Sequence, residues 1–123
     1  MITGKVSSEL RPQVLLTLVG GGGNEVEILA EIDTAFTGYL SIPRRQFDQL
    51  GWSLGADDNV MLGDGSEAVV SKGRGIVMWM EQPRIVDVHC FEVQPLLGRG
   101  MLHGCTLAID FRTGDDISIR PSV

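Results

Sequence analysis

Apolar and polar side chains alternate over residues 25–32 of the chain, with Leu29 as the one apolar residue among the glutamate positions. In an extended segment the apolar positions would share one face and the glutamates the other. This period of two predicts a β-strand with one buried face. An apolar run at residues 14–19 precedes it, and four glycines at 20–23 lie between the two segments. We therefore expect a β-hairpin here.

The rest of the chain repeats this pattern of short apolar segments separated by turn residues. Pro83 separates the expected strand that ends at residue 80 from the one that begins at residue 84. A helical turn is expected to contain Met101 and Leu102. One short helix is expected at 41–51, with Pro43 in its first turn and Gly51 at its end. The further expected strands are 59–62, 67–70, 75–80, 84–93, a short one near 95–97, 105–110 and 117–119.

Seven or eight short strands with one or two short helices predict an all-β barrel or sandwich. We expect one domain over residues 1–123, with no linker and no repeat. Apolar residues make up 43% of the chain but aromatic residues only 6%, so the core should be aliphatic.

Charge argues against two classes of partner. The chain contains ten Lys and Arg residues and sixteen Asp and Glu residues, so its net charge is −6. The basic residues are scattered, and only Arg44 and Arg45 are adjacent. Binding to nucleic acid or to an anionic membrane surface requires clustered basic residues. We therefore expect neither as a partner.

The N-terminus lacks the apolar region of a secretory signal, and no apolar stretch approaches the ~20 residues that cross a bilayer. Cys90 and Cys105 have no metal-ligand spacing. We expect two reduced thiols, although a disulfide between them stays open. We therefore expect a cytoplasmic protein that binds no metal and no cofactor.

Asp33 is the strongest candidate for chemistry. It directly follows the buried strand at 25–32, and the residues after it up to Gly38 are small except for Phe36. Small residues let backbone N–H groups approach a carboxylate and hold it ionised. The alternative interpretation is an ordinary turn aspartate that closes a strand.

The segment Ile32–Ala35 resembles the active-site motif of aspartic proteases, in which apolar residues precede Asp-Thr/Ser-Gly. Within it, Asp33 would be the catalytic residue, followed by Thr34 and Ala35. A second likeness lies downstream, where two apolar residues and a glycine precede a short helix. These residues are Leu96, Leu97 and Gly98.

Between these two motifs lies an Asp-Gly turn flanked by apolar runs, which is a strong hairpin signal. It occupies the place of the flap of aspartic proteases and consists of Gly63, Asp64, Gly65 and Ser66. The motifs occur once, in a chain about half the length of pepsin. The chain therefore resembles the retropepsin-like aspartic proteases. Its Ile42-Pro43 pair is similar to the Ile-Pro that follows the aspartate motif in the small prokaryotic members of this family.

The resemblance implies a retropepsin-like barrel, a C2 homodimer and an aspartic-type endopeptidase acting on peptide or protein substrates. Two Asp33 carboxylates, one from each subunit, would share a proton and activate a water molecule without a covalent intermediate. Thr34 would hydrogen-bond across the dimer axis, and residues 96–98 would pack beneath the catalytic loop. The flap would close over an extended peptide.

Two positions depart from the family. Ala35 stands where the family has glycine; a Cβ there costs on the order of 1 kcal/mol if φ is positive and nothing if φ is negative. Thr37 stands where many retroviral members carry an acidic residue that pairs with the arginine matching Arg99. Arg99 would then pair with Asp110 or with a carboxylate across the interface, or remain solvated. A catalytically silent dimerisation or peptide-binding module therefore stays open, as does, less favoured, an unrelated small β-barrel binding domain.

Other polar residues fit structural roles. Asp57 and Asp58 read as turn residues, and His89 and His103 lack matching metal ligands. Asp110 reads as a strand-end or salt-bridge residue. The residues suggested to line substrate subsites are Phe36, Leu62 and Ala68.

Overall fold

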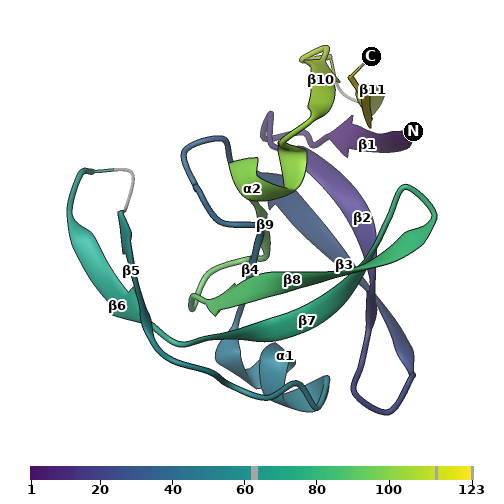
Figure 1. Cartoon of the computed structure of the whole chain (residues 1–123). Coiled ribbons are helices and arrows are strands. Elements are labelled where there is room, and N and C mark those ends of the chain that lie inside the picture. The colour runs from purple at the N-terminus through teal and green to yellow at the C-terminus, as the bar shows by residue number, and fades with distance from the viewer. Residues whose placement is uncertain (62–63, 113, 123) are drawn as a thin grey trace.

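The computed structural model describes residues 1–61, 64–112 and 114–122, shown in Figure 1. Its elements in chain order are β1 (Ile2–Val6), β2 (Pro12–Val19), β3 (Glu25–Ile32), β4 (Leu40–Ile42), α1 (Arg44–Gln49), β5 (Asp58–Met61), β6 (Glu67–Val70), β7 (Lys72–Trp79), β8 (Gln82–Cys90), β9 (Leu96–Leu97), α2 (Arg99–Leu102), β10 (Cys105–Ile109) and β11 (Gly114–Pro121). The fold is mostly β, as the alternation predicts.

Six strands form a closed barrel in the order β2-β3-β9-β4-β8-β7. The predicted hairpin of residues 14–32 is confirmed as β2 and β3, which pair antiparallel along their length. The barrel closes where β2 meets β7, through the pairs Leu18–Val77 and Val19–Ile76. Closure gives the backbone groups of all six strands a neighbour on both sides, which removes exposed edges.

Two parts of the chain lie outside the barrel. Strand β1 pairs with β2 and carries β11 and then β10 beyond it, at the top of Figure 1. Strands β5 and β6 form a separate two-stranded hairpin that stands to the left of the barrel in Figure 1. This hairpin contains the predicted Asp-Gly turn.

The core inside the barrel is largely aliphatic, as the composition predicts. Phe47 of α1 is fully buried and closes one end of the barrel with Leu50. Trp52 packs edge-to-face on Phe47, and its Nε1 donates to the carbonyl of Val19 at 2.9 Å. The largest fully buried aliphatic side chains are Leu18, Leu40, Ile42, Leu97, Met101 and Ile119.

The structure corrects several predictions from the pattern. The described residues form eleven strands rather than seven or eight, and β1 and β4 match no expected strand because they are too short or too irregular to show a period. Ser41 and Ile42 belong to β4 and not to a helix, since they pair with β8 and β9. Pro83 lies within β8 near its start, where a missing N–H is tolerated.

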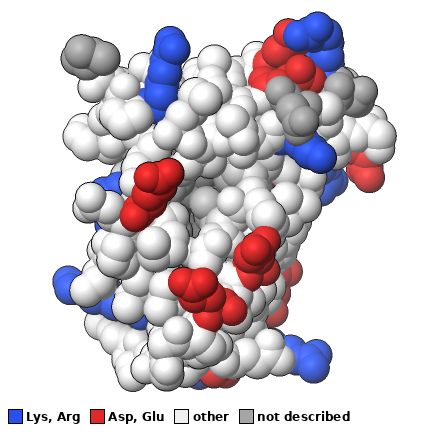
Figure 2. Space-filling model, turned by 90° about the vertical axis from the view of Figure 1, so that its right-hand side faces the viewer, with Lys and Arg blue, Asp and Glu red and all other residues white. Residues whose placement is uncertain are grey.

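Asp58 begins β5, so it is not a turn residue. On the face in Figure 2, acidic side chains lie apart from one another across a mostly uncharged centre, and at the upper right acidic side chains lie against a basic one. Among the described residues, no helix is long and apolar enough to cross a bilayer.

Barrel closure gives a direct test of the packing. Leu18 is fully buried in the seam between β2 and β7, whereas Leu15 on the same strand is 57% exposed. We expect Leu18→Ala to lower the free energy of unfolding by about 3 kcal/mol, because it leaves a cavity in a closed core. Leu15→Ala should change it by less than about 0.5 kcal/mol. Urea unfolding followed by circular dichroism measures both, and equal losses would contradict this seam.

Candidate functional site

Asp33 lies immediately after β3, where the strand leaves the barrel wall. Strand β9 runs parallel to the end of β3, with Glu31 beside Leu96 and Ile32 beside Leu97. The Asp33 N–H donates to the carbonyl of Leu97 at 2.9 Å and so continues this pairing by one residue. The backbone of Asp33 is therefore fixed to a segment far away in the sequence.

The loop from Asp33 to Tyr39 is held by a row of backbone hydrogen bonds. Gly98 N–H donates to Tyr39 O at 3.0 Å, Arg99 N–H to Phe36 O at 2.8 Å, and Gly100 N–H to Gly38 O at 2.9 Å. We call this row of bonds the loop clasp.

Gly98 must be small for the clasp to form. A Cβ at this position would collide with the carbonyl oxygen of Gly38 and lie 2.6 Å from the ring of Phe36. Leu97 is fully buried in the core, and Leu96 is half-buried beside the loop. The structure thus places residues 96–98 against the catalytic-loop candidate.

Ala35 adopts a backbone conformation that accepts a side chain. The non-glycine residues with positive φ among those described are Leu10, Met80 and Glu81. The φ of Ala35 is therefore not positive, and its Cβ imposes no left-handed strain. The Ala35 N–H donates to Asp33 Oδ1 at 3.0 Å, which keeps the hydrogen bond that a glycine at this position would also make.

Asp33 lines a pocket of about 280 Å³. Of the described residues that line it, Asp33 alone is ionisable, and Met61 comes from the β5–β6 hairpin. Phe36, suggested from the sequence, also lines it, but Ala68 does not. The lining residues are Asp33, Ala35, Phe36, Met61, Phe91, Val93 and Leu96.

Sequence reasoning missed Met61, Phe91 and Val93 as pocket residues. Each follows or ends a strand with an exposed or half-buried apolar side chain. That exposure was the signal, but it cannot be assigned to the neighbourhood of Asp33 without the barrel. Leu62, the remaining suggestion, lies outside the described residues.

The turn of the hairpin is shaped by Asp64. Its Oδ1 accepts from the Ser66 N–H at 2.9 Å and from the Ser66 hydroxyl at 2.6 Å, and these bonds lower the pKa of Asp64. Gly65 has a φ of 87°, which only glycine adopts easily. Gly63, the first residue of the predicted flap turn, lies outside the described residues.

Thr34 and Arg99 are both exposed. Within the described chain, neither side chain has a hydrogen-bond or ion-pair partner. Asp110 is not the partner of Arg99, because it pairs with Arg112, whose Nη2 lies 2.7 Å from its Oδ2. This confirms Asp110 as a salt-bridge residue, and the Arg112 hydrogen bond lowers the pKa of Asp110.

His89 connects the loop to the hairpin, a role that no sequence pattern suggested. Its ring is buried and packs edge-to-face on Phe36, with ring centroids 5.6 Å apart. Its Nε2 lies 2.9 Å from Oδ2 of Asp58, the first residue of β5. This hydrogen bond, aided by the charge of Lys72, lowers the pKa of Asp58.

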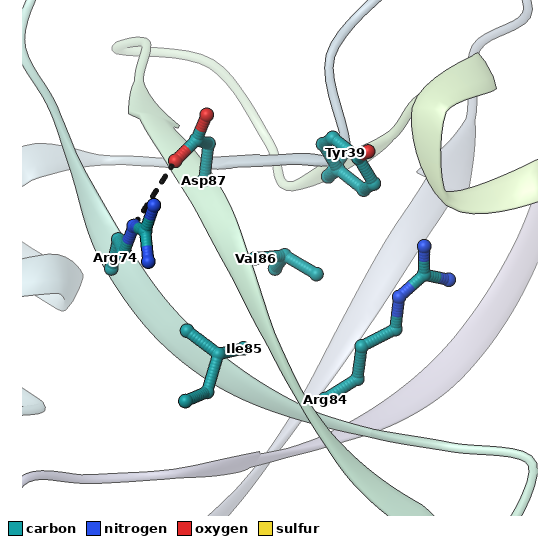
Figure 3. A pocket seen from close by; sticks show the side chains of 6 residues that line it. All are labelled: Tyr39, Arg74, Arg84, Ile85, Val86 and Asp87. Atoms are coloured by element: carbon teal, nitrogen blue, oxygen red, sulfur yellow. Dashed lines mark ion pairs between the residues drawn. The ribbon is translucent and has the colours of Figure 1, made fainter.

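A second pocket of about 230 Å³, shown in Figure 3, lies beside β7 and β8 and is not lined by Asp33. On one side Arg74 pairs with Asp87 at 3.8 Å. On the other, the Arg84 guanidinium lies over the ring of Tyr39, 5.4 Å from its centroid, and its Nη1 reaches Met101 Sδ at 3.8 Å. Arg84 therefore supports the end of the loop and α2 from outside.

In the described part of the chain, no three His, Cys, Asp or Glu side chains gather as metal ligands would. Cys90 and Cys105 are both free and half-buried, and burial raises the pKa of the Cys90 thiol.

Comparison with known proteins returns no match: no family model, no curated protein and no solved structure is similar to this chain at a significant level. The candidate site therefore depends on its own geometry and on the resemblance of its motifs.

The loop clasp can be tested at Gly98. We expect Gly98→Ala to lower the free energy of unfolding by about 2–3 kcal/mol, because the new Cβ would push apart backbone groups that hold the loop. Gly22→Ala is the matched control, since its Cβ would have only an ordinary 3.8 Å contact. The control should stay within about 1 kcal/mol of wild type. Thermal unfolding of both variants measures this, and a fully stable Gly98→Ala protein would contradict the clasp.

The Asp58–His89 hydrogen bond predicts a titration. Because the pKa of Asp58 in the folded chain lies below its ordinary 3.8, this bond stabilises the fold above that pH and is lost as the pH falls through the lower folded value. In His89→Leu, the Asp58 pKa should rise toward 3.8. The pKa of Asp110 should stay low there, since Arg112 and not His89 lowers it. Carboxyl-carbon NMR measures both groups, and an unmoved Asp58 would contradict the assignment.

Proposed function

We propose that this chain is an aspartic-type endopeptidase of the retropepsin-like kind, active as a C2 homodimer in which each copy supplies Asp33. The observation that supports the proposal is that Asp33 lines a largely apolar pocket and lies on a loop that the clasp binds to residues 98–100. A turn aspartate without chemistry would need neither the clasp nor the pocket.

The proposed reaction needs two carboxylates. Like charges a few ångströms apart do not both ionise readily, so the facing pair holds one proton. The ionised carboxylate takes a proton from a water molecule as general base. The resulting hydroxide adds to the scissile carbonyl carbon, while the protonated partner stabilises the developing oxyanion. The tetrahedral intermediate then collapses and expels the amine, whose nitrogen takes up the proton that the first carboxylate removed from water, so the pair again holds one proton.

One chain offers one such carboxylate, so the second must come from another copy. A twofold axis places identical residues face to face. Thr34 is exposed beside Asp33 and lacks a partner within the described chain, which leaves its hydroxyl available for a bond across that axis.

The substrate proposed is an extended segment of a peptide or protein. An extended segment can add to the β5–β6 hairpin by backbone hydrogen bonds, and its apolar side chains can enter the pocket lined by Phe36, Met61 and Phe91. The hairpin would then act as the flap that excludes water from the site. Two free thiols fit a reducing compartment, and we place the enzyme in the cytoplasm.

The silent dimerisation or peptide-binding module is the alternative. Its main support from the sequence was Ala35, but the φ of Ala35 is not positive and its N–H still bonds to Asp33. Ala35 therefore gives no structural reason for lost activity.

Activity against a denatured protein mixture separates the two. Wild type should cleave it, and Asp33→Asn should lose at least about a hundredfold in rate, because two amides cannot supply the base. Ala35→Gly, the matched control in the same loop, should stay within about threefold, since the N–H that bonds to Asp33 is kept. Cleavage is followed by mass spectrometry of the peptides released. Equal cleavage by wild type and Asp33→Asn would reject Asp33 as the catalytic residue.

The shared site also fixes the mass of the active species. Light scattering should give twice the 13.3 kDa of one chain under the conditions of the assay. A strict monomer that is fully active would contradict a site made by two copies.

A further inference from the structure

His89 occupies an unusual place between two parts of the molecule. Its side chain is only 6% exposed, although histidine is a polar residue at the end of the barrel strand β8. On one side its ring touches the Asp33 loop, through Phe36 and through Gly38, where an added Cβ would lie 3.1 Å from the imidazole. On the other side its Nε2 meets Asp58 at the start of the hairpin.

The β5–β6 hairpin forms a sheet of its own and shares no strand pairing with the barrel in the described part of the chain. At its end only Ser71 separates β6 from β7, and the Ser71 carbonyl accepts from the Cys90 N–H of β8 at 2.9 Å. Near its start, Leu54 makes a single bridge to Gly73, and Gly55 N–H donates to Lys72 O at 2.7 Å. The hairpin itself begins three residues later, at Asp58, where the contact with His89 is the shortest one to a side chain of the barrel.

The geometry of the ring makes Asp58 its essential partner. An ionised carboxylate only accepts hydrogen bonds, so Nε2 of His89 carries the hydrogen. The other ring nitrogen, Nδ1, is buried and has no hydrogen-bond partner among the described residues. Asp58 therefore supplies the one hydrogen bond that orients the imidazole within the described chain.

The charges around this contact come from three strands. Lys72 of β7 lies 3.9 Å from Asp58 and also 3.9 Å from Asp87 of β8. Arg74 of β7 pairs with the other oxygen of Asp87. Removing Asp87 thus alters the charge near Lys72 without touching His89, which makes it a suitable control.

We propose that His89 is a positioning residue that fixes the β5–β6 hairpin relative to the loop carrying Asp33. Its ring contacts Phe36 on one side and Asp58 on the other. The distance across the Asp33 pocket, between the loop and the β5–β6 hairpin, is thereby held constant. The consequence for substrate binding rests on the proposed peptidase function, whereas the anchoring of the hairpin does not.

Hydrogen–deuterium exchange on the purified full chain at neutral pH tests the anchoring directly. In Asp58→Ala and His89→Leu, amides of residues 58–61 and 67–70 should exchange about fivefold faster than in wild type, since one charge-assisted hydrogen bond is lost. His89→Gln should lie between them and wild type, because its side-chain amide can still donate to Asp58. The control Asp87→Ala should match wild type.

Amides of the β2–β3 hairpin distinguish positioning from general stability. They should exchange at wild-type rates in each variant. Unchanged exchange in residues 58–61 and 67–70, or an equal increase in β2 and β3, would overturn the proposal. If His89→Leu does not fold, Asp58→Ala decides alone, since the Asp58 side chain is 40% exposed and its loss leaves no cavity.

Kinetics tests the consequence for the site. In Asp58→Ala, the KM for a peptide substrate should rise about fivefold while kcat stays within about twofold, because the hairpin binds substrate but carries no reacting group. An unchanged KM alongside faster exchange would overturn the link to substrate binding. A wild-type chain without Asp33-dependent cleavage would reject the peptidase, while the exchange result would still decide the anchoring.

Discussion

The parallel pairing of β9 with the end of β3 is the constraint on which the rest of the site depends. Strand β9 has only two residues, yet it fills the gap between β3 and β4 and so completes the barrel. The chain then continues through Gly98 along the loop, whose carbonyls it binds one after another. Because these are backbone bonds, the position of Asp33 depends on main-chain geometry and on the absence of a side chain at Gly98.

The candidate site lies between the loop that carries Asp33, which is held by several contacts, and the β5–β6 hairpin, which is held by fewer. The loop carrying Asp33 is bound on one side by the clasp and supported on the other by Arg84 beneath Tyr39. The β5–β6 hairpin forms a sheet of its own and meets the loop through the contact of Asp58 with the buried His89. The apolar pocket lies between them. The extended substrate that we propose needs such a division, because a hairpin fully paired to the barrel could not make room for it.

A single carboxylate per chain makes assembly part of the proposed mechanism. The barrel positions one Asp33, and the chemistry of water activation asks for a second acid whose ionisation is coupled to the first. The alanine after Thr34 does not disturb this arrangement, since its backbone is not left-handed and its N–H bonds to the carboxylate. The departure from the usual glycine is therefore a change of side chain and not of loop conformation.

Local pattern was sufficient for the long elements. The alternation over 25–32, the Asp-Gly turn and the apolar pair before Gly98 predicted β3, the β5–β6 hairpin and β9 with α2, and the order of these motifs led to Asp33 as the candidate. Only the tertiary structure decided the three-residue β4, the closure of β2 on β7, the residues lining the pocket and the contact of His89 with Asp58. The physical reason is the distance along the sequence between the residues that interact. A period is visible only over several consecutive residues, whereas these features join residues that are distant in the sequence and meet only when the barrel closes.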